Sequence, residues 1–345
     1  MKKLVLLLLV VCLLLVGCGA KEDRPAPVVI PRTTLRPAQG DGGWGYVNKA
    51  GTFVIQPQFQ YAGNFSDWGL APVLLGDTWG YVDLNGNMEI PAQFEYADEI
   101  SGNGLAVVKL DGLYGYMNPK GEVVIKPQFA DAKSFGNGAL APVKMGEKWG
   151  FADDAGQIVV EPQFDDAWAF SANALARVMV GTKYGYINGA QQLVIPAIYQ
   201  QAWDFNDDGL ALATGDGLLW GYIDSDGQPV IPAQFAKAGD FSQGVAPVLV
   251  DGKYGYINVN GEIVIEPQFD LARPFAANGL AAVRIGELWG YIDLNGAIQI
   301  QPQFSDTDGF YGVDFAWAVK DLTKGTLQES GEFIPMPQLG LIVVE

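Results

Sequence analysis

Apolar and polar residues alternate along short stretches of this chain, and the stretches come in sets of three. Residues 44–48 (WGYVN) alternate, and so do residues 53–59 (FVIQPQF). Gly51 lies between these two stretches, where it tolerates the positive φ of a tight turn. Residues 70–73 (LAPV) supply a third apolar stretch. Alternation with a period of two predicts β-strands, so each set predicts a three-stranded antiparallel meander. About nine residues link one meander to the next.

The set recurs at steps of 34 to 36 residues. Each copy begins with an aromatic residue followed by glycine, which we call the lead aromatic: Trp44, Trp79, Tyr114, Trp149, Tyr184, Trp220, Tyr254 and Trp289. A closing aromatic always follows 15 residues later: Phe59, Phe94, Phe129, Phe164, Tyr199, Phe235, Phe269 and Phe304. A fixed period of this size predicts a repeat array rather than separate domains.

Proline positions indicate which strand lies in the middle of each meander. Prolines occur in the second stretch of every copy, as at Pro57, and in the third stretch of some, as at Pro72, but never in the lead stretch. Because proline cannot donate to a β-ladder, it is confined to edges and strand ends. The lead stretch is therefore predicted to be the middle strand. Prolines on the edges also discourage edge-to-edge pairing, so neighbouring sheets are expected to pack face to face.

The copies carry a family resemblance. The pattern W-G-Y-[IV]-[DN]-x-x-G, followed by [IV]-x-P-x-[FY] and later by G-L-A-x-V, resembles the bacterial WG-containing repeat. The match covers about Trp44 to Lys320 in eight copies. The resemblance implies a β-repeat fold. Members are often envelope proteins, and the resemblance implies no particular activity.

Atypical units stand at both ends of the array. Residues 35–38 look like a lone third strand, and residues 325–335 resemble a degenerate ninth hairpin without the lead aromatic. Because atypical end units act as caps in open arrays, they favour an open, curved, β-solenoid-like stack of about eight to nine sheets. A β-propeller-like ring is the alternative, although nine blades exceed the usual four to eight. Both arrangements are all-β.

The first residues of the chain look like a lipoprotein leader. Lys2 and Lys3 precede an apolar run, residues 4–16, that is short for a membrane span. The run ends in Leu-Val-Gly-Cys, which resembles a bacterial lipobox, and this resemblance implies cleavage before Cys18 and acylation of its thiol. The alternative is an ordinary signal peptide that happens to contain a cysteine. Gly19 after the cysteine implies the outer membrane in a diderm cell, and otherwise the outer face of the plasma membrane.

These predictions divide the chain into four parts. Residues 1–17 are expected to be a lipoprotein signal peptide, and residues 18–33 a lipidated cysteine with a flexible, proline-rich tether. Residues 34–320 hold the eight repeats. Residues 321–345 form the degenerate ninth hairpin and the C-terminal cap.

Charge and composition exclude several functions. The formal net charge is −18, and such an acidic surface repels nucleic-acid backbones. The chain contains no histidine, which is the commonest general base and metal ligand. No catalytic motif or metal-ligand cluster is apparent, so we expect no enzyme activity, cofactor or metal.

Two acidic patterns nevertheless resemble known kinds of functional site. Asp83, Asp224 and Asp293 each begin an Asp-x-[Asn/Asp]-Gly stretch like the start of a calcium loop. Such a loop also needs a glutamate at position twelve, which from Asp224 is Phe235, so these stretches are better interpreted as turns. Asp165 and Asp166 are a carboxylate pair of the kind that glycoside hydrolases use, although they lie in a link between units.

One column of the repeat predicts a binding site. Four residues after the closing aromatic, successive copies carry Gly63, Asp98, Lys133, Trp168, Trp203, Gly239, Arg273 and Asp308. This mixture indicates an exposed position, where large aromatic residues often mark recognition sites. Trp168 and Trp203 are therefore candidate ligand-binding residues on the same edge of neighbouring units. The alternative is that both indoles lie flat on their own links. The lead tryptophans are instead expected in the core, because they are strictly periodic.

The carboxylates near the two candidate residues, Asp166, Asp204 and Asp207, favour a polar or cationic ligand over an anionic one. The sequence therefore predicts a non-catalytic cell-envelope lipoprotein, anchored in the membrane through Cys18, that presents an extended acidic surface to a protein or cell-wall glycan partner. The alternative is an envelope glycan-active hydrolase that uses the carboxylates of the links. The sequence makes no prediction of the oligomeric state.

Overall fold

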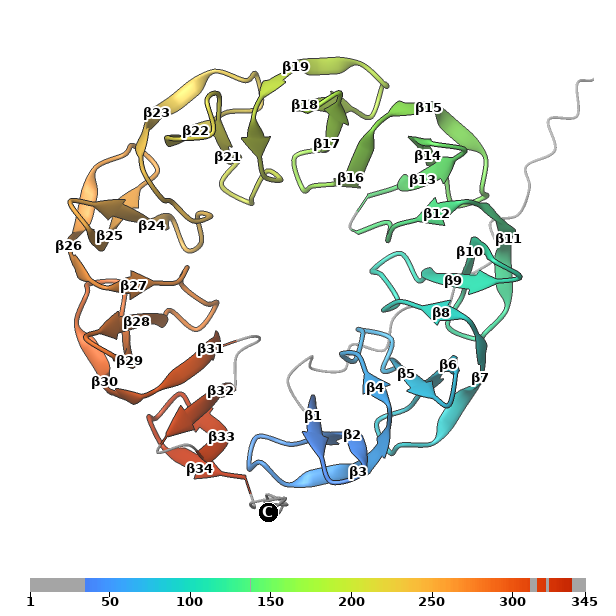
Figure 1. Ribbon diagram of the computed structural model, residues 1–345, viewed down its shortest axis with the longest axis horizontal. Helices are drawn as coiled ribbons and strands as arrows, with labels where there is room; N and C mark the ends of the chain where they lie inside the picture. The colour runs from blue at the N-terminus through green and yellow to red at the C-terminus, as the bar shows by residue number, and fades with distance from the viewer. Residues whose placement is uncertain (1–34, 137, 311–314, 321–322, 337–345) are drawn as a thin grey trace, which may run out of the picture.

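The computed structural model describes residues 35–136, 138–310, 315–320 and 323–336. These residues form strands, turns and loops with no helix, and the strands make nine separate antiparallel sheets. Figure 1 shows the sheets as blades around a ring, with the first blade beside the ninth. The described chain is therefore a nine-bladed β-propeller. The expected signal peptide, Cys18 and the tether lie outside the described residues.

Each blade contains three long strands in sequence order, of which the second lies in the middle. The first of the three is β1 (Arg36–Gly40), β5 (Ala71–Leu75), β9 (Ala106–Leu110), β13 (Ala141–Met145), β17 (Leu175–Val180), β21 (Ala211–Thr214), β24 (Val245–Val250), β28 (Ala281–Ile285) or β32 (Phe315–Lys320). The middle strand is β2 (Gly43–Val47), β6 (Thr78–Val82), β10 (Leu113–Met117), β14 (Lys148–Ala152), β18 (Lys183–Asn188), β22 (Trp220–Ile223), β25 (Lys253–Asn258), β29 (Leu288–Ile292) or β33 (Thr323–Gln328).

The outer strand of each blade lies on the rim of the ring (Figure 1). These strands are β3 (Phe53–Phe59), β7 (Met88–Phe94), β11 (Val123–Phe129), β15 (Ile158–Phe164), β19 (Leu193–Tyr199), β23 (Pro229–Phe235), β26 (Ile263–Phe269), β30 (Ile298–Phe304) and β34 (Phe333–Pro335). Seven blades add a short inner strand: β4 (Tyr61–Ala62), β8 (Tyr96–Ala97), β12 (Asp131–Ala132), β16 (Asp166–Phe170), β20 (Gln201–Ala202), β27 (Leu271–Ala272) and β31 (Asp306–Phe310).

The structure decides between the two expected arrangements. The ring is confirmed, and the preference for an open stack is wrong because the first and last sheets contact each other. The lead strand is the middle strand, as the prolines predicted. The inner strand was not predicted, since most copies of it hold only two paired residues inside the link. In blade 2, for example, Tyr61 pairs with Leu74 and Ala62 pairs with Val73.

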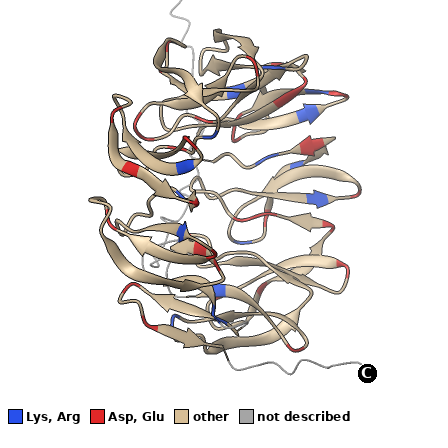
Figure 2. Cartoon of the chain, turned by 60° about the vertical axis from the view of Figure 1, so that its left-hand side comes forward, with Lys and Arg blue, Asp and Glu red and all other residues tan. Residues whose placement is uncertain are grey.

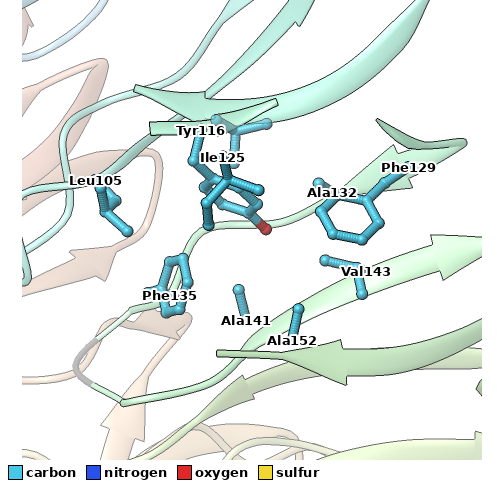
Figure 3. Close-up of a cluster of buried hydrophobic side chains, with 10 residues drawn as sticks. Leu105, Tyr116, Ile125, Phe129, Ala132, Phe135, Ala141, Val143 and Ala152 are labelled. Carbon is cyan, nitrogen blue, oxygen red and sulfur yellow. The ribbon is translucent and has the colours of Figure 1, made fainter. Parts of the chain in front are cut away.

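The core lies between the blades. A face of large side chains on one blade packs there on a face of small side chains on the next. Between blades 3 and 4, Tyr116 and Phe129 of one blade pack on Ala141, Val143 and Ala152 of the next (Figure 3). These five residues are all at most 1% exposed. Apolar burial of this kind is the main favourable contribution to folding. Because the two surfaces belong to different blades, each blade needs a neighbour on both sides.

A buried tyrosine in the middle strand ties most blades to the next one, whereas blade 4 has Phe151 at this position. The hydroxyl of Tyr116 donates to the backbone oxygen of Lys133 in the next blade at 2.9 Å. The same bond forms from Tyr46 to Gly63 and from Tyr81 to Asp98. Because a buried hydroxyl without a partner is costly, these bonds fix the angle at which the blades meet. The tyrosines, two residues after the lead aromatics, are the largest fully buried side chains.

The ring closes through a smaller contact between blades 9 and 1. The buried cluster there contains only Ala38, Val47 and Met336, with Phe53 and Trp317 packed against it. Polar contacts add to it. Thr326 Oγ1 and Gln328 Nε2 donate to the Lys49 oxygen at 3.0 and 2.5 Å, and Arg36 pairs with Asp308 at 3.1 Å. Residues 325–335 form the expected ninth hairpin, but they do not cap an open array, because they belong to the middle and outer strands of the ninth blade.

The residue after each lead aromatic is glycine because the backbone of the outer strand lies too close for a side chain. A Cβ atom at Gly80 would lie 2.6 Å from the Ile90 oxygen and 2.7 Å from the Ala92 nitrogen. The ladder between β6 and β7 is irregular at this point, which brings the backbone of β7 close to the glycine. The side chain is therefore excluded by backbone atoms that cannot move aside.

We predict that Gly80→Ala destabilises the protein by at least about 2 kcal/mol, because overpacking against backbone cannot relax. The control is Gly76→Ala in the same blade. Gly76 has a φ of +66° but no atom within 4 Å of an added Cβ, so its replacement should cost only about 1 kcal/mol of conformational strain. Urea unfolding measures the free energy of unfolding of the two variants. Equal losses of stability would contradict the close approach of the outer strand to Gly80.

Candidate functional site

One face of the propeller carries the direct connections between blades, and we call it the crossover face. The connections are single residues between an outer strand and the next inner strand: Gln60, Glu95, Ala130, Asp165, Gln200, Asp270 and Ser305. The tight turns before the middle strands lie on the same face. The Gln60 side chain, for example, accepts a hydrogen bond from the Gly76 nitrogen at 3.0 Å, and Asp165 accepts one from the Gly181 nitrogen at 2.6 Å.

The two candidate residues lie in the inner layer of neighbouring blades, as their shared column predicted. Trp168 belongs to β16 of blade 5 and is half-buried. Trp203 follows β20 of blade 6 and is 50% exposed. The Trp168 ring also packs on Tyr184, with the ring centroids 5.7 Å apart. Of the two indoles, Trp203 is the one that remains open to a ligand.

A buried arginine lies beside both indoles. The guanidinium carbon of Arg177, a residue of β17, is 4.1 Å from the Trp168 ring centre and 5.7 Å from that of Trp203. Lys133 Nζ lies 4.5 Å from the rings of both Trp149 and Trp168. Cations and aromatic rings therefore alternate across blades 4 to 6, and each contact of this kind is attractive. The sequence did not reveal Arg177 as a partner, because it belongs to a different column of the repeat.

Two nearby carboxylates are paired with these cations. Asp166 lies 2.6 Å from Lys133 Nζ, and Asp204 lies 3.1 Å from Arg177 Nε. Arg177 Nη1 also donates to the Ala202 oxygen, although Arg177 Nε has no well-aligned hydrogen bond. Of the acidic residues expected to attract a cationic ligand, only Asp207, which is exposed, lacks such an ion pair among the described residues.

The environment of the site shifts two acidic pKa values upward. Loss of solvent raises the pKa of Asp204, whose side chain is still 48% exposed, and the Arg177 charge partly offsets this rise. Desolvation also raises the pKa of Asp240 in blade 7, and the negative charge of Asp204 adds to it. Both pKa values rise mainly because the carboxyls lose contact with solvent, and the charge of Arg177 opposes the rise in each case.

A cavity of about 460 Å³ opens beside Trp203 between blades 5 and 6. Arg177 and Tyr184 line it together with Thr182, Gln200 and the Trp203 ring. Aromatic rings, amides and a hydroxyl around one cation suit a neutral or polar ligand that stacks and accepts hydrogen bonds. The structure brings Trp168 and Trp203 around the same arginine, and their role in ligand binding stays a prediction.

The repeat itself identifies the family. Eight consecutive segments match the family described as WG containing repeat: residues 44–79, 79–114, 114–149, 149–184, 184–217, 220–254, 254–289 and 289–321. The chain belongs to the WG repeat family. No curated protein sequence matches it.

Solved structures share the fold of this WG repeat protein at low sequence identity. A crystal structure of a eukaryotic initiation factor superposes with a TM-score of 0.62 at 11% identity, covering 89% of this chain and 100% of that one. BamB from Moraxella catarrhalis gives 0.40 at 12% identity, covering 88% and 94%. The WD40 β-propeller domain of Doa1 gives 0.32 at 12% identity, covering 62% and 86%. The first of these likenesses supports the propeller fold.

The lead aromatics of the WG repeats are less buried than the sequence suggested. Trp149 and Trp289 are 6% and 7% exposed and belong to the core. Trp44, Trp79 and Trp220 are only half-buried. The core position is filled instead by the tyrosine two residues later. The lead aromatics thus lie where the core meets the crossover face.

The carboxylate pair considered for hydrolysis is held by lysines. Asp165 lies 2.6 Å from Lys148, and Asp166 lies 2.6 Å from Lys133. The hydrogen bonds from Lys148 and from the Gly181 nitrogen lower the pKa of Asp165. A glycosidase needs one carboxyl with a raised pKa as its general acid, whereas the bonds to Asp165 shift its pKa in the opposite direction.

The acidic turns have the local bonds of turn residues. Asp83 Oδ1 accepts hydrogen bonds from the Asn85 and Asn87 nitrogens at 2.9 and 2.8 Å, and Asp224 and Asp293 accept equivalent bonds. Within the described ranges, no three His, Cys, Asp or Glu side chains are grouped as metal ligands. That part of the chain also contains no helix long and apolar enough to cross a membrane.

A larger cavity lies elsewhere, among the inner loops of blades 1 to 4. Its volume is about 720 Å³, and its lining includes Arg36, Ser66, Asp98, Glu99 and Ser134. These loops point toward the middle of the ring (Figure 1). No sequence pattern indicated this cavity, because it depends on how successive blades are placed.

We predict that Trp168→Ala lowers the free energy of unfolding by about 1–2 kcal/mol, since the ring contacts both Lys133 and Arg177. The matched change Trp203→Ala should cost less than about 0.5 kcal/mol, because that ring is half exposed. Urea unfolding of the two single variants measures this. Equal losses would show that both rings serve packing alone.

We also predict that Asp165 titrates below the ordinary aspartate pKa, and that Lys148→Gln moves its pKa upward by removing the main cause of the shift. A carboxyl with a lowered folded pKa stabilises the fold above its unfolded pKa and loses this contribution as the pH falls through the folded value. Carboxyl NMR titration measures both proteins. An unchanged pKa in the variant would contradict the ion pair.

Proposed function

We propose that this WG repeat protein is a non-catalytic binding or scaffold protein of the cell envelope, held to the membrane through a lipidated Cys18. Its partner, a protein or a cell-wall glycan, binds the crossover face at blades 5 and 6. Trp203 is the central contact, and the cavity beside it receives one group of the partner. The acidic surface excludes nucleic acid as that partner.

One observation carries this proposal: large apolar side chains are exposed at comparable positions of three successive blades on the crossover face. Met145, Val180 and Leu218 end or follow the first long strand of blades 4, 5 and 6 and are 46%, 44% and 73% exposed. Trp203, beside the cavity, is 50% exposed. Large apolar side chains exposed in neighbouring units often mark interaction sites in soluble proteins. Acidic residues, which outnumber basic ones, are spread over the blades around it (Figure 2).

The rigidity of the site supports binding rather than catalysis. Arg177 is only 7% exposed, and its charge is paired with Asp204. The lowered pKa of Asp165 is the opposite of what the general acid of a glycosidase needs. A preorganised aromatic and polar surface lowers the entropy lost on association.

We expect a photo-crosslinking amino acid at Trp203 to join the full-length protein to a discrete envelope component. The same amino acid at Val264, which is 46% exposed on outer strand β26, is the control. Adducts from position 203 that are absent from position 264 support a site on the crossover face. Adducts of equal yield at both positions, or none at position 203, would overturn the proposed site.

The anchor is tested independently. We expect Cys18→Ala to abolish labelling of the protein with radioactive palmitate and to leave its leader uncleaved by the lipoprotein pathway. Normal labelling and processing of this variant would show that the lipoprotein assignment is wrong, whatever the crosslinking result.

A further inference from the structure

Blades 1 to 3 carry a second aromatic surface on the crossover face, apart from the cavity at Trp203. Five rings follow one another: Trp44, Tyr61, Trp79, Tyr96 and Tyr114. Neighbouring ring centroids are 5.6, 5.5, 5.9 and 6.1 Å apart, and the planes are tilted by 45° to 63°. We call these five residues the aromatic stripe. Tyr61 and Tyr96 are its most open members, at 47% and 38% exposed.

The stripe is peculiar to these blades. Tyr61 and Tyr96 occupy the position two residues after the closing aromatic, where other copies carry Asp131, Asp166, Gln201, Lys237, Leu271 and Asp306. Only here does an aromatic side chain bridge the lead aromatics of adjacent blades. The repeat pattern itself therefore does not require the stripe.

Several lead aromatics have a lysine or arginine side chain over the ring. The Trp149 ring has Lys133 Nζ at 4.5 Å, and the Trp289 ring has Arg273 at 5.1 Å. Tyr114, the last ring of the stripe, has Lys109 Nζ at 5.2 Å. In each case the chain places its own cation on the ring. Within the described ranges, no lysine or arginine lies over Trp44 or Trp79 in the same way.

The charge around the stripe is complementary to a cation. The tight turns that precede Trp44, Trp79 and Tyr114 carry Asp41, Asp77 and Asp111, and all three aspartates are exposed. Burial and the charge of nearby Asp98 also raise the pKa of Tyr96 to about 12, which indicates a negative field at this ring. A cation above exposed rings and beside carboxylates gains from both.

We propose that the aromatic stripe binds an extended, lysine- or arginine-rich segment of a partner protein. The cationic side chains lie on Tyr61 and Tyr96 and face the carboxylates of the adjoining turns. This inference rests on the proposed binding function and adds a second contact surface with a defined partner chemistry.

Two other occupants fit the stripe less well. A glycan chain stacks its successive sugar faces on rings that are nearly coplanar, whereas these neighbouring rings are tilted by at least 45°. A second copy of this chain would bring two molecules of net charge −18 together, and like charges oppose such contact.

The probe is a fluorescent peptide of alternating lysine and proline, which proline keeps extended, with a glutamine-for-lysine peptide as its uncharged counterpart. Binding to the full chain is measured by anisotropy at physiological ionic strength. We expect Tyr61→Ala with Tyr96→Ala to weaken binding of the lysine peptide by roughly fivefold to twentyfold, and Tyr61→Phe with Tyr96→Phe to leave it within about twofold. The phenylalanine pair keeps the rings, so it separates their role from that of the hydroxyls.

Matched controls come from blade 8 on the same face. Ile285 and Leu288 are 40% and 41% exposed, and changing both to alanine should leave binding within about twofold. Asp41→Asn with Asp77→Asn should weaken binding more than Asp251→Asn with Glu287→Gln, although both pairs change the net charge equally. Thermal unfolding checks that each variant is folded.

Equal effects of the stripe variants and their controls would mean non-specific attraction to an acidic protein and would overturn the proposal. Equal binding of the two peptides would overturn it as well. If a soluble cell-wall oligosaccharide binds through Tyr61 and Tyr96 while the lysine peptide does not, the occupant is a glycan and the proposal is wrong. The proposed function would survive any of these results as long as crosslinking at position 203 yields a discrete adduct.

Discussion

The structure depends on the fit between a bulky face of one blade and a small face of the next. A tyrosine such as Tyr116 fills the space over Ala141 and Val143, and its hydroxyl bonds to the backbone of the inner strand beside them. Neither face is covered by residues of its own blade. In an open array the two end blades would each leave one such face in water, and apolar exposure on that scale is unfavourable. Closure of the ring removes both exposed faces at once.

The closing contact departs from this rule. In blade 9 the position of the tyrosine is held by Thr326, and the buried cluster against blade 1 has only three members. The hydrogen bonds to Lys49 and the ion pair between Arg36 and Asp308 replace part of the lost apolar contact. Because stability is not uniform across a structure, this contact is where the ring is expected to open first. The two proposed binding surfaces on the crossover face lie in blades 1 to 3 and in blades 5 and 6, away from the contact between blades 9 and 1 except at blade 1.

Much of the fold can be predicted from the sequence because each strand carries its own signal. Alternation locates the strands, glycines locate the turns, and prolines such as Pro57 identify the edges. Ring closure could not be predicted, because it depends on the small rotation between blades and no single unit encodes that rotation. For the candidate site, the common column placed Trp168 and Trp203 in equivalent positions of adjacent blades. It could not reveal Arg177, which reaches them from another strand, or the tyrosines of the aromatic stripe, whose contacts cross from blade to blade.

The closed ring is the central claim, and the distance between its first and last blades tests it most directly. Nitroxide labels at Ala50 and Ser330 would lie on exposed turns of blades 1 and 9, close to the contacts of Lys49 with Thr326 and Gln328. Cys12 and Cys18 would be replaced by alanine so that only these two positions react. Double electron–electron resonance should give one short, narrow distance distribution. A long or broad distribution would place the two blades at opposite ends of an open array and contradict the account.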